Sequence, residues 1–143
     1  MKPDIEQYSA ALHARRHTAR KLRYRSVAES DWTPQPAQCH ANVDHMVRSH
    51  PALKAVRGWL IRATDGNEGR NYAAHSVIED HGELFDITLQ SQEECDHYPF
   101  IEHVGPEDEF WAVVTICCEK WYPIPDLQAA LSEGADGGFE DGY

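Results

Sequence analysis

The sequence predicts an α+β domain in which a cysteine-bearing helix packs on an antiparallel β-sheet. Two segments, 4–25 and 38–49, repeat apolar residues every three or four positions, as amphipathic helices do. Four apolar runs predict the strands of the sheet: 56–62, 72–79, 83–89 and 110–118. A chain of 143 residues has room for one core, so residues 1–133 are interpreted as one domain, followed by a flexible acidic tail over 134–143.

The first helix is predicted over residues 4–25, where Ile5, Tyr8 and Leu12 recur at helical spacing. Its His13 and His17 lie one turn apart, and we interpret them as solvated residues of a basic helix face. Residues 26–37 contain two prolines and are expected to form an irregular loop.

The second helix is predicted over residues 38–49, with a stripe of Val43, Met46 and Val47 and with Pro51 after its end. Cys39 therefore falls in the first turn of this helix. Unpaired backbone N–H groups and the helix dipole lower the pKa of a thiol at that position. The polar neighbours of Cys39 favour a functional cysteine over a buried structural one.

A tight hairpin is predicted between strands 72–79 and 83–89, with His81 and Gly82 as the central turn residues. In this register Ile78 pairs with Phe85. Side chains alternate between the two faces of a strand, so His75 and Asp86 share one face, on neighbouring strands and diagonal to each other.

The remaining segments are read from composition alone. Residues 90–97 are polar and predict a loop. The run 110–118 is apolar throughout, which predicts a central strand. Residues 126–133 predict a short C-terminal helix.

Cys39, His75 and Asp86 are the residue types of a thiol nucleophile, its base and the carboxylate that orients the base. A thiol with an ordinary pKa is a poor nucleophile until a histidine takes its proton. The histidine in turn needs a partner that fixes its tautomer and holds its charge. The expected oxyanion donors are the Cys39 backbone N–H and a nearby Gln38 or Gln35 side chain. Two further residues are expected to line the cleft or to act as local cap and core: Asn42 and Trp59.

The order helix-Cys, strand-His, strand-Asp, with the run from His75 to Thr88, resembles the transglutaminase-like branch of the papain-like cysteine peptidases. The resemblance covers residues 34–89 and implies a papain-like fold. It implies Cys39 as nucleophile, His75 as base and Asp86 as orienting acid, with amide or peptide hydrolysis or acyl transfer as the reaction. The residues around the cysteine, Gln38 to Asn42, differ from those usual in that family.

The amino-acid composition limits the classes of binding partner and the cellular location that we expect. A net charge of −11 argues against nucleic acid and against an anionic membrane surface. No apolar run is long enough for a membrane span, and the four cysteines do not suggest a disulfide framework, so we expect reduced thiols in a cytoplasmic protein. The expected substrate is a protein, a peptide or a small-molecule amide, and the chemistry requires no cofactor.

Two alternatives remain open on the sequence. Nine histidines make a zinc site the main competing hypothesis, although zinc ligands usually occur as closely spaced pairs. The candidate ligands are Cys39, His40, His45, His50, His75, Cys95, His97 and His103. The other alternative is a binding module that keeps the cleft without catalysis.

Overall fold

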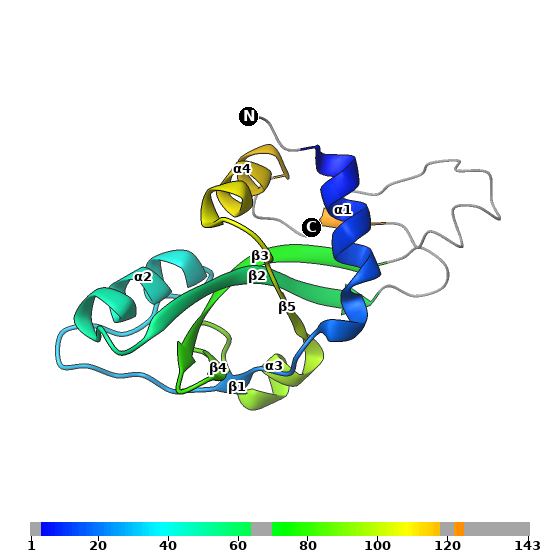
Figure 1. Cartoon of the computed structure of the whole chain (residues 1–143). Helices are drawn as coiled ribbons and strands as arrows, with labels where there is room; N and C mark the ends of the chain where they lie inside the picture. The colour runs from blue at the N-terminus through cyan, green and yellow to red at the C-terminus, as the bar shows by residue number, and fades with distance from the viewer. Residues whose placement is uncertain (1–3, 64–69, 118–121, 125–143) are drawn as a thin grey trace.

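The computed structural model describes residues 4–63, 70–117 and 122–124, which form helices around a β-sheet (Figure 1). The elements in chain order are α1 (Ile5–Ala14), the 3-10 turn η1 (Arg16–Thr18), β1 (Arg23–Tyr24), α2 (Cys39–Ser49), β2 (Lys54–Ala63), β3 (Arg70–Asp80), β4 (Glu83–Asp86), α3 (Gln92–His97), β5 (Phe100–Glu102), α4 (Glu107–Cys117) and β6 (Tyr122–Ile124). The predicted α+β class is confirmed. The helix expected over 126–133 and the tail 134–143 lie outside the described residues.

The strands form one mixed sheet in the order β1-β4-β3-β2-β5, and β6 also pairs with β3. All pairs are antiparallel except β1 with β4, which is parallel. The expectation of a wholly antiparallel sheet is therefore wrong. The parallel pair arises because the segment after η1 adds to the outer edge of β4, where Arg23 lies opposite Phe85.

The β3–β4 hairpin has the predicted register, with Ile78 opposite Phe85 and Asp80 opposite Glu83. The two central residues His81 and Gly82 have φ of 53° and 83°, the positive values that a tight two-residue hairpin turn requires. β4 ends at Asp86, three residues before the predicted end. The cause is a turn at Asp86, whose Oδ1 accepts hydrogen bonds from the backbone N–H groups of Thr88 and Leu89 at 2.7 Å each.

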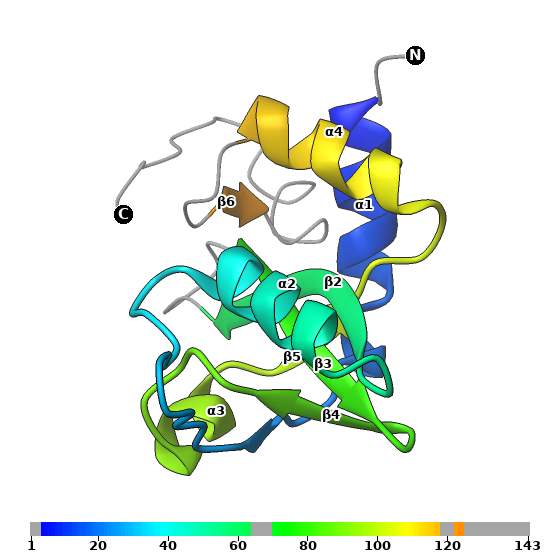
Figure 2. The same ribbon diagram turned by 90° about the vertical axis from the view of Figure 1, so that its left-hand side faces the viewer.

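Both faces of the sheet are apolar and covered. One face packs against α1 and α4 at one end and against α2 at the other. Its buried residues include Leu12, Val43, Met46, Trp59, Ile61, Tyr72, Ala74, Ile78, Phe110, Val113 and Val114. The opposite face lies against α3 and the segment around β1, with Leu22, Val56, Leu60, Val77, Leu84, Cys95 and Phe100. The views in Figure 1 and Figure 2 show α1 and α4 above the strands and α3 with β1 below them.

The predicted first helix is too long. α1 ends at Ala14, and the chain becomes extended at Ala19 after one 3-10 turn. The backbone of Arg20 then pairs with Phe100 in both directions, at 2.8 and 2.9 Å. A helical residue at position 20 cannot make these bonds, so pairing with β5 determines the conformation of this segment.

The predicted central strand over 110–118 is also wrong, because this run forms α4. Its buried residues Phe110, Val113 and Val114 follow helical spacing, while Ile116 is exposed. Three acidic residues in the first turn, Glu107 to Glu109, favour a helix start through the dipole. The loop predicted over 90–97 contains α3, which Ser91 caps by accepting the Glu94 N–H. Within the described ranges, no helix combines the length and apolar content needed to cross a membrane.

Candidate active site

Cys39 is the first residue of α2, as the sequence predicts, and its side chain is 8% exposed. Gln38 occupies the N-cap position but makes no side-chain cap bond. Its neighbour Ala37 has a φ of 60°, a left-handed conformation that is uncommon for alanine. The backbone N–H of Cys39, in the first helical turn, has no carbonyl one turn earlier within the helix.

His75 and Asp86 form a buried pair on the face of the sheet that α3 covers. His75 Nε2 hydrogen-bonds to Asp86 Oδ2, and the carboxylate is fully buried. The other oxygen, Oδ1, accepts the N–H groups of Thr88 and Leu89. Because Asp86 occupies Nε2, Nδ1 is the ring nitrogen that remains for the thiol.

The position of His75 depends on a glycine on the neighbouring strand. Gly58 lies opposite His75 in the β2–β3 pair. A Cβ at Gly58 would lie 2.3 Å from Ile101 O and 2.6 Å from Phe100 Cζ. The absence of a side chain therefore lets β5 approach β2 and lets the Phe100 ring lie edge-on to His75, with 6.5 Å between the ring centroids.

The thiol and the imidazole come from opposite sides of the sheet. α2 packs on the face of Ile78, whereas alternation along β3 directs His75 to the other face. β3 pairs with β6 at residues 70–72 and with β4 at residues 78–80. Between these pairs, the described part of the chain supplies no strand beside that edge of β3. This gap in the sheet explains how the start of α2 brings Cys39 into hydrogen-bonding reach of His75.

The electrostatics of the pair favour an ionised thiol. Burial raises the pKa of Cys39, but hydrogen bonds and charge interactions with His40 and His75 outweigh burial and lower it to about 6. Burial lowers the pKa of His75, but the charge and hydrogen bond of Asp86, together with Cys39, raise it to about 10. Burial raises the pKa of Asp86, and His75 and the two backbone N–H groups lower it overall. Both shifts favour a thiolate beside an imidazolium at neutral pH.

Asn42 fastens the loop that precedes the cysteine. Its side chain is buried, and it both accepts from the N–H of Gln35 and donates to the carbonyl of Gln35, at 2.9 Å each. Its Nδ2 also donates to Thr88 Oγ1 at 3.0 Å. One amide therefore joins the pre-cysteine loop, α2 and the chain just after Asp86.

The structure places the other predicted site residues as follows. The Gln35 amide donates to the Thr33 carbonyl at 3.1 Å, and the Gln38 side chain is exposed. Trp59 is 1% exposed, packs in the core and donates from Nε1 to Tyr8 Oη at 2.9 Å. Trp59 has no exposed face to offer a substrate, so its role is the core packing that the sequence also allowed.

His40 is a site residue that sequence reasoning treated only as a candidate zinc ligand. It lies beside Cys39, and its Nδ1 is 2.5 Å from Ser76 Oγ. Ser76 also accepts from Arg57 NH1 at 2.8 Å. His40 directly follows Cys39 in the sequence and Ser76 directly follows His75, which is the signal that could have indicated them.

The remaining candidate zinc ligands are dispersed. His45 and His50 face Glu29, His103 binds Tyr8 Oη and the Pro106 carbonyl, and Cys95 and His97 belong to α3. Among the described residues, no group of three or more histidine, cysteine and acidic side chains is placed to hold a metal ion.

Comparisons with protein-family models, with curated proteins and with solved structures find no match for this chain. The similarity to transglutaminase-like proteins therefore remains a resemblance carried by the residues quoted above.

Proposed function

We propose that the protein is a thiol-dependent amide hydrolase or acyl transferase with Cys39, His75 and Asp86 as its catalytic triad. The observation that carries the proposal is the buried His75–Asp86 pair next to a thiol at a helix N-terminus, with the pKa of that thiol lowered to about 6. The order of the three residues in the chain and on their elements supports a transglutaminase-like or papain-like architecture.

In this mechanism the Cys39 thiolate attacks the amide carbonyl carbon, and the carbonyl electrons move to oxygen. The Cys39 backbone N–H donates to that oxyanion. His75 gives its Nδ1 proton to the departing amine, so the C–N bond breaks and a thioester remains on Cys39. Water or a second amine then attacks the thioester while His75 accepts its proton, which releases the acid or the new amide. Asp86 holds the imidazole in place and stabilises its charge.

The test is the rate of Cys39 alkylation by iodoacetamide as a function of pH, with the labelled peptide identified by mass spectrometry. At pH 6 a thiol of pKa about 6 is about half ionised, against about 0.3% for an ordinary thiol. A thiolate of low pKa is intrinsically less nucleophilic. We therefore expect Cys39 to be alkylated about tenfold faster than an ordinary thiol at pH 6. His75→Ala is expected to remove that advantage.

Cys95 is the internal control, because it is buried and its pKa is raised to about 12 by burial and by the charges of Asp86, Asp96 and Glu94. It should label slowly in both proteins. An ordinary thiol profile at Cys39 in both the wild type and His75→Ala would refute the catalytic proposal and favour a binding module.

A further inference from the structure

A second imidazole contacts the thiol from the face of the sheet opposite His75. His40 follows Cys39 on α2 and lies close enough to the thiol to lower its pKa. Its Nδ1 is bound to Ser76 Oγ at 2.5 Å. Nδ1 is therefore occupied by Ser76, and the other ring nitrogen, Nε2, is buried.

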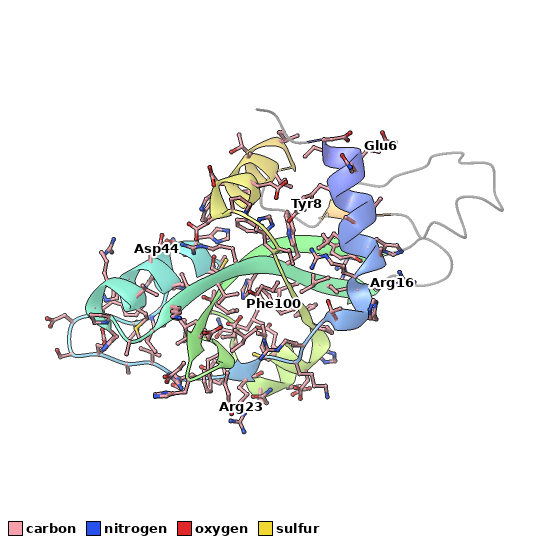
Figure 3. All side chains as sticks on the ribbon, in the orientation of Figure 1. Glu6, Tyr8, Arg16, Arg23, Asp44 and Phe100 are labelled. Atoms are coloured by element: carbon pink, nitrogen blue, oxygen red, sulfur yellow. The ribbon has the colours of Figure 1, made fainter. Side chains whose placement is uncertain are left out.

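Ser76 is itself held by a buried guanidinium. Arg57 NH1 donates to Ser76 Oγ at 2.8 Å, and NH2 donates to Asp44 Oδ1 at 2.7 Å. The Arg57 side chain is 8% exposed, and Glu107 of α4 lies 3.4 Å from its Nε. Figure 3 shows Asp44 on the side of α2 that faces α4. The guanidinium of Arg57, which belongs to β2, thus contacts β3, α2 and α4, and its position is fixed from these three elements.

The proton positions in this chain of hydrogen bonds follow from the donors available. A guanidinium only donates, so Ser76 Oγ accepts from Arg57 and keeps one hydrogen to donate. We assign that hydrogen to His40 Nδ1, the ring nitrogen that lies against Ser76 Oγ, which makes Nδ1 the acceptor. With Nδ1 as the acceptor, the ring proton sits on Nε2.

The ring of His40 is also fixed by packing. It meets Trp111 edge-on with centroids 4.9 Å apart, and Phe110 likewise at 6.1 Å. Because α4 supplies both aromatic rings and α2 and β3 supply the polar contacts, the imidazole is preorganised before any substrate binds.

We propose that His40 is a second catalytic imidazole, whose fixed Nε2–H donates to the carbonyl oxygen of the substrate when the Cys39 thiolate attacks. As the C–S bond forms, negative charge leaves the sulfur and appears on the carbonyl oxygen. The His40 Nε2–H group stabilises the charge on that oxygen. His75 with Asp86 carries the proton, whereas His40 with Ser76 and Arg57 stabilises charge. This role rests on the proposed function, and it assigns to His40 the oxyanion task that the sequence suggested for a glutamine side chain.

The test uses two substitutions of His40 by amide residues, one that can replace the Nδ1 contact and one that can replace the Nε2 donor. His40→Asn can place an amide near Nδ1 and keep the contact with Ser76, but it does not reach the thiol. His40→Gln is longer and can place an amide N–H near the Nε2 position. The readouts are alkylation by iodoacetamide, which creates no oxyanion, and acylation by p-nitrophenyl acetate, which does.

We expect His40→Asn to slow acylation by about 100- to 1,000-fold, a range set by the loss of one oxyanion donor, and to slow alkylation less. The pH profile of alkylation should shift upward in the same variant. His40→Gln should recover a substantial part of both. The charged and titratable groups around the site that shape this profile are His40 and Asp44 of α2, Arg57 of β2, His75 of β3, Asp86 of β4 and Glu107 of α4.

The matched control is His81→Asn at the exposed hairpin turn, where a positive φ suits asparagine and both rates should stay at the wild-type value. Wild-type rates in His40→Asn would overturn the role of His40 while His75→Ala still supports the triad. Equal losses in His40→Asn and His40→Gln would also overturn it, because a packing role does not distinguish the two amides. An ordinary Cys39 thiol in the wild type would instead refute the proposed function itself.

Discussion

At the scale of single residues, Asp86 is the group on which the state of His75 depends. Its two oxygens have different partners. Oδ1 accepts hydrogen bonds from two backbone N–H groups, and Oδ2 binds His75 Nε2. The first set fixes the carboxylate with respect to the chain after β4, and the second fixes the ring. A fully buried carboxylate with three donors keeps its charge, because each donor replaces water that burial removes.

Asp86→Asn is therefore expected to retain the turn after β4 but to lose the activation of Cys39 by His75. The asparagine oxygen can still accept from Thr88 and Leu89, but its NH2 group then faces His75 Nε2. That donor makes Nε2 an acceptor and leaves the ring proton on Nδ1, which is the wrong tautomer to take the Cys39 proton. Alkylation at pH 6 should fall by about tenfold, to the level of His75→Ala.

The measurement is the iodoacetamide rate, together with circular dichroism to confirm the fold. Asp96→Asn on α3, where the carboxylate is exposed, should label like the wild type. Wild-type labelling in Asp86→Asn would show that Asp86 does not orient the base.

The pairing of His75 with Asp86 could be predicted from sequence because its geometry is local. A two-residue turn at His81 and Gly82 sets the register, and the register alone puts His75 and Asp86 on one face. The roles of His40 and Ser76 could not be obtained in this way. Their contact requires that α2 packs on the face of Ser76 while Cys39 meets His75 at the unpaired edge of β3, and no local spacing encodes that arrangement.

At the scale of elements, the start of α2 is held by the Asn42 side chain more than by a helix cap. Gln38 makes no side-chain cap bond, whereas Asn42 ties Gln35 and Thr88 together through three hydrogen bonds. The strained Ala37 lies between Gln35 and Cys39. We infer that these bonds hold the backbone conformation that presents the thiol.

Asn42→Ala should thus lower both the stability of the fold and the reactivity of the Cys39 thiol. Removing a buried amide leaves the N–H and carbonyl of Gln35 and the Thr88 hydroxyl to find other partners, which should cost about 2–3 kcal/mol in the free energy of unfolding. Urea denaturation measures this loss, and the Cys39 labelling rate should fall as well. Arg48→Ala, at an exposed position of the same helix, should change stability by at most about 0.5 kcal/mol. If Asn42→Ala is destabilised but its Cys39 labelling rate is unchanged, Asn42 stabilises the fold without positioning the thiol.

The elements that the sequence predicted wrongly are those whose tertiary partners decide the outcome. In α4, the β-branched residues Val113, Val114 and Ile116 favour a strand by composition. The acidic first turn and the burial of Phe110, Val113 and Val114 at helical spacing are the opposing signals. The residues after Ala14 favour a helix locally, yet Arg20 pairs with Phe100, a partner that is 80 positions away in the chain.

At the scale of the whole molecule, the buried charges link the stability of the fold to pH. Burial opposes the charged form of His75, but Asp86 and then Cys39 outweigh it and raise its pKa from 6.5 to about 10. The unfolded chain loses this proton near pH 6.5 and the folded protein only near pH 10. The stabilisation by charged His75 is therefore complete below about pH 6.5 and disappears as the pH rises through about 10.

The comparison that isolates this effect is Cys39→Ser against Cys39→Ser with His75→Gln, since serine removes the titration of the thiol. The difference in unfolding free energy between the two, from urea denaturation, should be smaller at pH 9 than at pH 6. Each pH unit between the two pKa values removes at most about 1.4 kcal/mol, and without the thiolate we expect a decrease of about 1–3 kcal/mol. Titrations elsewhere cancel because both variants contain the same groups. A difference that stays constant or grows with pH would mean that His75 is neutral in the fold, and the thiolate–imidazolium pair would then have no basis.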